Sequence, residues 1–223
     1  SMTGKIDRID TCQSENDKLL FRIIDYKSGI KKLSLLDVYY GTELQLPVYI
    51  DEAVNCERQL HSGKEIVPAG MFYYHIADPI IDADGEMTEE AERDAKMKQQ
   101  KMSGILCGGR DTASKMDSAL ETGASSLVIP AAYKVSGEPA TSSQTYSNED
   151  FKTIVSYAKR KTGELGCGIG SGDISVSPLE TNKKCMCDFC DYKTVCMIDT
   201  RLPGYSKRIA GQLDNDTVIK KMR

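Results

Sequence analysis

The sequence of 223 residues predicts an α/β fold. Three observations support this prediction: a pair of strand-like segments near the start, an aromatic strand-like segment further on, and several helical segments with capping residues. An apolar content of 40% and a charged content of 28% are ordinary for a globular protein. The apolar runs are too short to cross a membrane and no signal-peptide pattern opens the chain, so we expect a cytoplasmic protein.

The first strands and the first helix are expected within residues 4–55. Residues 4–13 and 17–27 are predicted to form a hairpin, joined by a polar turn. Residues 34–55 are predicted to form a helix, because their apolar residues recur every three or four positions. Ser34 fits the cap of this helix, and Pro47 predicts a kink within it.

The rest of the chain is predicted to alternate between strands and helices. Strands are expected at 69–78, 125–134 and 173–178, and helices at 88–102, 112–120 and 147–163. In the last helix Ser147 is the expected cap and Gly163 the expected end. The glycines of 163–173 lack the spacing of a phosphate-binding loop, so we expect a turn there.

The charge is unevenly distributed along the chain. The net charge of −4 argues against a simple basic nucleic-acid coat protein. Residues 183–223 nevertheless hold nine Lys or Arg against five Asp or Glu. This segment is interpreted either as a contact for a phosphate backbone or as a solvated terminal face.

An acidic residue and a basic residue end the second predicted strand. Asp25 and Lys27 are two positions apart, so their side chains should point the same way. The hairpin can bring Asp7 beside Asp25, and two carboxylates suit Mg²⁺ or Mn²⁺. With a lysine to hold or deprotonate a water, these groups could attack a phosphodiester. The alternatives are a strand-end salt bridge between Asp25 and Lys27 and a surface pair of the Arg8–Asp10 kind.

The order of these motifs resembles the PD-(D/E)XK nuclease superfamily, most closely its RecB-like branch. The motifs are G-x-x-D ending at Asp7, D-Y-K-S starting at Asp25, and Q-x-x-x-Y from Gln45 to Tyr49. The resemblance implies a restriction-endonuclease-like fold, a mixed central sheet flanked by helices, and a Mg²⁺-dependent deoxyribonuclease acting on DNA.

The resemblance also implies a role for each motif residue. Asp7, Asp25 and the backbone carbonyl of Tyr26 would bind the metal ion. Lys27 would position the attacking water. Gln45 and Tyr49 would line the cleft and contact DNA or orient Lys27.

One expected ligand is missing from the sequence. RecB-like nucleases supply a histidine from a helix before these motifs, but only three residues precede Gly4, and Ser1-Met2 resembles an expression scar. We therefore expect an excised piece, truncated at its N-terminus and not fully active alone. Of the later histidines, His75 is predicted to be a packed core residue, and His61 offers no clear substitute.

Four of the eight cysteines fall within twelve residues, as in a metal site. Cys187, Cys190 and Cys196 have a spacing that suits zinc or an iron–sulfur cluster, with Cys185 the nearest fourth ligand. The other four are predicted to be buried small hydrophobic residues. These are Cys12, Cys56, Cys107 and Cys167.

A nuclease core followed by C-x2-C-x5-C resembles the C-terminal domain of the AddB family of bacterial helicase/nuclease subunits. The resemblance implies a nuclease core at 1–180 and a cysteine-rich tail at 181–223 that packs on the core. It implies a [4Fe-4S] cluster on Cys187, Cys190 and Cys196, with a distant fourth cysteine outside this sequence, so that the cluster is absent or incomplete here. It also implies an AddA-like partner and a role in double-strand-break repair by homologous recombination. The alternatives are a non-catalytic DNA-binding or scaffold module and a zinc-binding interaction domain.

Overall fold

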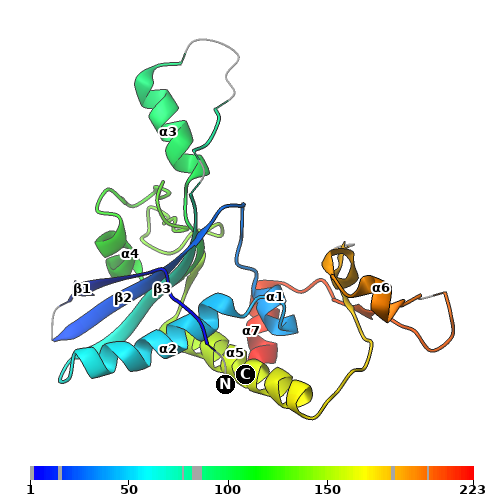
Figure 1. Ribbon diagram of the computed structural model, residues 1–223. Helices are drawn as coiled ribbons and strands as arrows, with labels where there is room; N and C mark the ends of the chain where they lie inside the picture. Colours follow the sequence, from blue (N-terminus) through cyan, green and yellow to red (C-terminus); the bar gives the residue numbers. More distant parts are fainter. Residues whose placement is uncertain (1–2, 15–16, 77, 82–86, 182–183, 200) are drawn as a thin grey trace.

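A five-stranded mixed sheet forms the centre of the protein (Figure 1). The structure is a computed structural model that describes residues 3–14, 17–76, 78–81, 87–181, 184–199 and 201–223. The strands are β1 (Arg8–Gln13), β2 (Lys18–Lys27), β3 (Glu65–His75), β4 (Ser103–Cys107) and β5 (Thr145–Tyr146), in that order across the sheet. β1–β2 and β3–β4 are antiparallel, whereas β2–β3 and β4–β5 are parallel. The predicted α/β class with a mixed sheet is confirmed.

The predicted hairpin forms, and its register decides which side chains share a face. Arg8 lies opposite Ile24, and Asp25 lies beside Tyr73 of β3. Residues 15 and 16 of the predicted turn lie outside the described residues. The β2–β3 register shifts between Phe21 and Arg22, next to Pro68. A bulge of this kind accommodates a proline, which cannot donate a hydrogen bond within the sheet.

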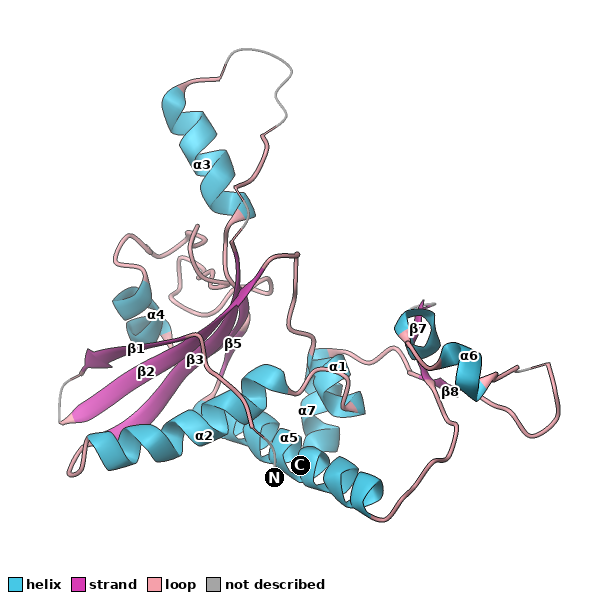
Figure 2. Cartoon of the chain, viewed as in Figure 1, coloured by secondary structure: helices cyan, strands magenta, loops and turns pink. Residues whose placement is uncertain are grey.

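Helices α1 (Leu35–Tyr40), α2 (Gln45–Leu60), α5 (Asn148–Gly170) and α7 (Asn215–Met222) pack on one face of the sheet. Figure 2 shows α2 and α5 running beneath the strands. This face carries the larger hydrophobic core, because alternate residues of β2 point into it. The largest fully buried side chains of this core include Phe21, Ile23, Leu46, Ile50, Phe151 and Ile154.

The other face carries a smaller core under α4 (Arg110–Met116) and the loop that follows it. This core contains Ile24, Phe72, Leu106, Leu120 and Ile129. Helix α3 (Glu89–Gln99) projects away from the sheet and buries none of its described residues (Figure 1). Among the described residues, no helix combines the length and the apolar content needed to span a bilayer.

The helix predicted at 34–55 is two helices. Ser34 caps α1 by accepting a hydrogen bond from the Asp37 N–H, as predicted. The break comes at Gly41, which ends α1 with a φ of 82° that favours glycine. Pro47 lies in the first turn of α2, where its missing N–H is not needed, so the predicted kink is wrong.

Other boundaries also differ from the predictions. The predicted strand at 125–134 is an irregular loop with isolated bridges, and Pro130 interrupts its hydrogen bonding. Strand β3 starts earlier than predicted, and β4 was not predicted. The helix expected at 112–120 is α4, which ends at Met116. Helix α5 begins at its Ser147 cap as predicted.

The glycine-rich segment after residue 163 is helical, contrary to prediction. Helix α5 continues through Gly163 to Gly170, because helix packing outweighs the roughly 1 kcal/mol propensity cost of each glycine. Residues 173–178, predicted as a strand, have no regular structure. The next strand is β6, which starts at Leu179.

The cysteine-rich segment forms a small unit with its own three-stranded sheet, in the order β7-β6-β8. Its elements are β6 (Leu179–Thr181), β7 (Lys184–Cys185), η1 (Met186–Phe189), α6 (Lys193–Cys196) and β8 (Arg208–Ile209). Figure 2 shows this unit to one side of α1 and α7. After it the chain returns to the main core, where Val218, Ile219 and Met222 of α7 are buried. The division of the chain at residue 180 stays a prediction.

Candidate active site

The end of β2 carries a closed set of polar contacts among three side chains. Asp25, only 3% exposed, forms an ion pair with Lys27. The Gln45 side-chain amide donates a hydrogen bond to Asp25 Oδ1 over 2.9 Å, and its oxygen accepts one from Lys27 Nζ over 3.0 Å. Asp25 and Lys27 share a face because they are two positions apart in a strand, and Gln45 meets them from the first residue of α2.

Asp7 joins this set through the backbone of Tyr26. Asp7 Oδ2 accepts a hydrogen bond from the Tyr26 N–H over 3.0 Å. The N–H and C=O of one strand residue face the same edge, so the Tyr26 carbonyl faces the edge where Asp7 lies. The structure therefore brings Asp7, Asp25 and Lys27 around one peptide segment, as the hairpin predicted.

Tyr49 and Gly4 complete the arrangement. Tyr49 lies one turn after Gln45, and its hydroxyl is 3.4 Å from the Gln45 side-chain nitrogen. A Cβ atom on Gly4 would lie only 2.9 Å from the Tyr49 ring. The absence of a side chain at Gly4 thus lets the N-terminal segment pass close to Tyr49 on its way to Asp7.

The comparisons with known proteins agree with this geometry. The family model of the PD-(D/E)XK nuclease superfamily matches residues 1–197. The chain belongs to the PD-(D/E)XK nuclease superfamily. The predicted restriction-endonuclease-like fold class is confirmed.

The curated relatives of this PD-(D/E)XK chain share one name, that of a subunit of an ATP-dependent helicase/deoxyribonuclease, and they belong to the AddB family. The relative from Alkaliphilus metalliredigens is 33% identical over 222 residues, and the one from Bacillus cereus strain ATCC 14579 is 34% identical over 223 residues. The relative from Listeria welshimeri is 34% identical over 222 residues. The matches cover 99–100% of this chain but 19% of each relative, so the chain spans about a fifth of their length.

The other face of the hairpin carries a separate ionic network. Asp10 pairs with Arg8 over 2.6 Å and with Arg22 over 2.9 Å, and Arg8 Nη1 donates to the Tyr26 hydroxyl over 3.3 Å. Burial opposes ionisation of Asp10, but the two guanidinium groups outweigh it and lower the pKa of Asp10. The surface pair Arg8–Asp10 thus exists beside the Asp25 cluster of the PD-(D/E)XK motifs and is distinct from it.

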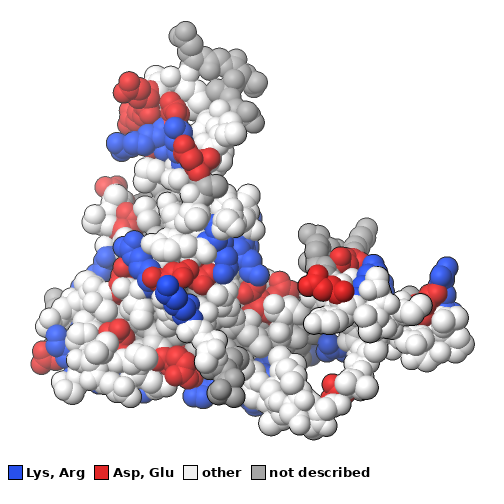
Figure 3. Space-filling view, viewed as in Figure 1, with Lys and Arg blue, Asp and Glu red and all other residues white. Residues whose placement is uncertain are grey.

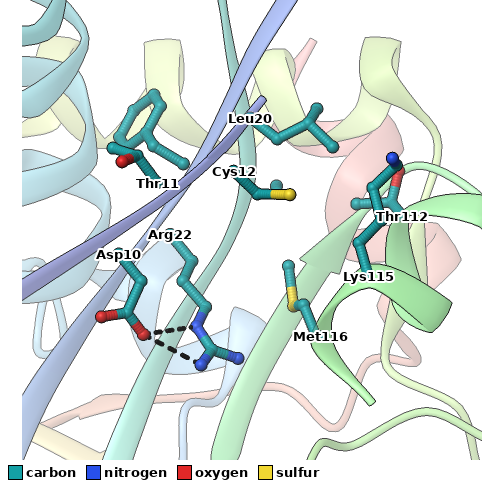
Figure 4. Close-up of a pocket in the computed structure, with 10 residues that line it drawn as sticks. Asp10, Thr11, Cys12, Leu20, Arg22, Thr112, Lys115 and Met116 are labelled. Atoms are coloured by element: carbon teal, nitrogen blue, oxygen red, sulfur yellow. Dashed lines mark hydrogen bonds and ion pairs between the residues drawn. The ribbon is translucent and has the colours of Figure 1, made fainter. Parts of the chain in front are cut away.

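A cavity of about 310 Å³ adjoins this network (Figure 4). In Figure 4 the Arg22 guanidinium turns toward Asp10, with Met116 and Lys115 across the cavity. Asp25, Lys27 and Gln45 do not line it. The cavity therefore lies outside the candidate active site of this PD-(D/E)XK chain.

Two residues beside the site were missed by the sequence analysis. The Tyr73 hydroxyl donates a 2.5 Å hydrogen bond to Glu43 Oε1, and Lys31 pairs with the other Glu43 oxygen. Burial, and next the Glu43 carboxylate, raise the pKa of Tyr73. The only signals were an acidic residue just before the Q-x-x-x-Y motif and a tyrosine in the aromatic strand, and neither reveals the contact between them.

Neither histidine lies among the clustered motif residues. His75 is half-buried, belongs to neither core, and its Nε2 lies 3.0 Å from the Ser28 carbonyl oxygen, so its prediction as a core residue is wrong. It lies beside Lys27 in the β2–β3 register. His61 follows the last residue of α2, roughly 24 Å along the helix from Gln45.

The clustered side chains offer oxygen ligands for a divalent cation. Asp25 Oδ2 is buried and accepts no hydrogen bond from the described residues, although Lys27 pairs with it. Within the described ranges no three His, Cys, Asp or Glu side chains are grouped to hold a metal ion. A cation here would thus depend on the two carboxylates and the Tyr26 carbonyl, which are hard ligands that suit Mg²⁺ or Mn²⁺.

The cysteines differ in exposure. Burial, followed by the nearby thiols of Cys185, Cys190 and Cys196, raises the pKa of Cys187. These thiols are close, but the part of the chain that the structure describes does not arrange three of them as a metal-binding group. Of the four scattered cysteines, only Cys107 is buried as predicted, and burial raises its pKa to about 12. The prediction is wrong for the exposed cysteines Cys12, Cys56 and Cys167.

Proposed function

We propose that this chain is a metal-dependent DNA nuclease domain that hydrolyses phosphodiester bonds. The observation that supports this most directly is the buried Asp25–Lys27–Gln45 cluster with Asp7 bound to the adjoining backbone. A buried carboxylate and an ammonium cost solvation energy, which a purely structural ion pair seldom recovers. A PD-(D/E)XK nuclease needs these groups for chemistry.

Each residue has a proposed role. Asp7, Asp25 and the Tyr26 carbonyl would hold Mg²⁺ or Mn²⁺, which when bound stabilises negative charge on the phosphoryl oxygens. Lys27 would hold the attacking water by a hydrogen bond from its ammonium group. Gln45 fixes the direction of both Lys27 and Asp25, and Tyr49 lies against Gln45 where a DNA strand would pass.

The names of the relatives extend the proposal to a larger assembly. We infer that the chain acts as the nuclease domain of an AddB-like helicase/nuclease that works in the cytoplasm with an AddA-like partner. Exonuclease cleavage during double-strand-break repair by homologous recombination would be its task. The identity over nearly the whole chain supports this part of the proposal.

The cysteine-rich unit would hold a [4Fe-4S] cluster in the longer protein. Cys187, Cys190 and Cys196 would supply three ligands, and a cysteine from another segment the fourth. Support comes from their spacing and from the closeness of the four thiols around Cys187. Iron and sulfide in anaerobically purified longer protein would support the cluster, whereas one equivalent of zinc without iron would replace it with a zinc site.

The test of the nuclease proposal is cleavage of single-stranded DNA in Mg²⁺. Lys27→Ala is expected to lower the cleavage rate by about 10²-fold or more, because the group that positions the water is lost. Lys18→Ala is the matched control, since Lys18 begins the same strand and is half-exposed. Equal cleavage by the wild type and Lys27→Ala would remove Lys27 from the mechanism and with it the proposal.

A further inference from the structure

A second lysine is fixed beside the proposed catalytic lysine. Lys31 follows β2, and its ammonium group pairs with Glu43, whose side chain is only 9% exposed. The Lys31 side chain itself is 43% exposed. One face of this ammonium group is therefore held by protein while the other remains open to solvent.

Glu43 and Tyr73 determine where Lys31 lies. One oxygen of Glu43 accepts the Tyr73 hydroxyl and the other pairs with Lys31, so both oxygens have partners. The ring of Tyr73 lies under both lysines, 5.9 Å from Lys31 Nζ and 5.3 Å from Lys27 Nζ. Because each ammonium has its own carboxylate, the two positive charges can stand close together without strong repulsion.

The site lies where a DNA strand would approach. Figure 3 shows Lys and Arg side chains over the loop that follows β2, next to acidic side chains near the start of β1. A lysine holds three N–H donors, and the pair with Glu43 leaves donors of Lys31 free for a ligand. Fixing this long side chain in advance lowers the entropy lost when it binds an anion.

We propose that Lys31, held by Glu43 and Tyr73, binds a phosphate of the DNA strand next to the phosphate that is cleaved. This rests on the proposed function, since it assigns Lys31 to the substrate of the same site. Glu43 and Tyr73 are positioning residues. Their contacts place the Lys31 ammonium on the same aromatic ring as Lys27, within one or two nucleotides of an extended strand.

The test is the salt dependence of binding to a fluorescent single-stranded oligonucleotide, measured by anisotropy in EDTA so that the strand stays intact. Lys31→Gln is expected to reduce the slope of log Kd against log salt concentration by about 0.7, the value for one single-strand phosphate contact. Lys32→Gln is the matched control, because Lys32 is the adjacent exposed lysine. Lys31→Arg should keep the wild-type slope.

Folding and function are separated from binding by two further measurements. The double variant Lys31→Gln/Glu43→Gln leaves no unpaired carboxylate and should show the same reduced slope with a wild-type melting temperature. A wild-type slope in this variant and in Lys31→Gln, or an equal reduction in Lys32→Gln, would overturn the inference. Cleavage in Mg²⁺ by the wild type and Asp25→Asn is followed in parallel. Cleavage that does not depend on Asp25 would count against the proposed function and leave the Lys31 binding result standing.

Discussion

Gln45 is the side chain that joins the acid and the base of the candidate site. Its nitrogen donates to Asp25 and its oxygen accepts from Lys27, so one amide satisfies two charged groups. Only an amide offers a donor and an acceptor in this geometry, because a carboxylate would repel Asp25. The Q-x-x-x-Y motif of the superfamily thus has a direct physical reason in this chain.

The first prediction concerns Gln45→Leu. The substitution leaves Asp25 Oδ1 buried without its donor, which should lower the free energy of unfolding by about 1–3 kcal/mol. Lys27 also loses one of its two fixed partners, and misplacement of this kind should slow cleavage by about 10²-fold. Urea denaturation and single-turnover cleavage measure the two effects.

Gln99→Leu is the control for this substitution. Gln99 is the exposed last residue of α3, so this variant should match the wild type in stability and rate. A Gln45→Leu variant that is equally stable and equally fast would show that the amide does not organise the site.

Residue-scale predictions from the sequence succeeded where strand geometry alone decided the outcome. Alternation placed Asp25 and Lys27 on one face, and the hairpin placed Asp7 beside Tyr26. Glu43 could not be found in this way, because its contact with Tyr73 joins a loop to a distant strand. Local periodicity carries no information on such a pair.

At the scale of elements, α7 shows how a short C-terminal helix can belong to the main core. Its residues Val218, Ile219 and Met222 are buried in the same hydrophobic cluster as α1 and α5. Asp214 caps the helix by accepting a hydrogen bond from the Thr217 N–H over 2.8 Å. Helix α7 therefore contributes to the stability of the face on which α2 presents Gln45.

The second prediction concerns this helix. Ile219→Ala removes buried methyl groups from the junction of α1, α5 and α7, and should lower the free energy of unfolding by about 2–5 kcal/mol. Lys220→Ala, at the exposed neighbouring position, should change it by less than about 0.5 kcal/mol. If the two variants unfold at the same urea concentration, α7 does not stabilise the core.

The sequence predicted where several helices begin but less accurately where they end. Ser34, Thr88 and Ser147 each accept a backbone hydrogen bond at the start of a helix. The end of α5 was missed, because Gly163 normally favours termination but tertiary packing decides whether a helix continues. Strand β4 was missed because it is short and its partners lie far away in the sequence.

At the scale of the whole molecule, the arrangement separates the acidic site from the cysteine-rich unit. The site is built by β1, β2 and α2 within the first 60 residues, whereas the cysteines lie in a unit that is placed to one side (Figure 2). Composition and spacing identified both units, but the return of the chain to the core through α7 depends on long-range packing that no local pattern reveals. The superfamily match, which ends at residue 197, also leaves this helix outside.

The central claim is that β1 and β2 bring Asp7, Asp25 and Lys27 to one divalent-cation site. Calorimetric titration with Mn²⁺ tests it most directly, in the wild type and in Asp7→Asn, Asp25→Asn and Asp10→Asn. Asp10 is the matched control, because it lies on the opposite face with Arg8 and Arg22. The account predicts one Mn²⁺ site that is lost in Asp7→Asn and in Asp25→Asn and retained in Asp10→Asn. Wild-type Mn²⁺ binding in the Asp7 and Asp25 variants, or its loss in Asp10→Asn alone, would contradict it.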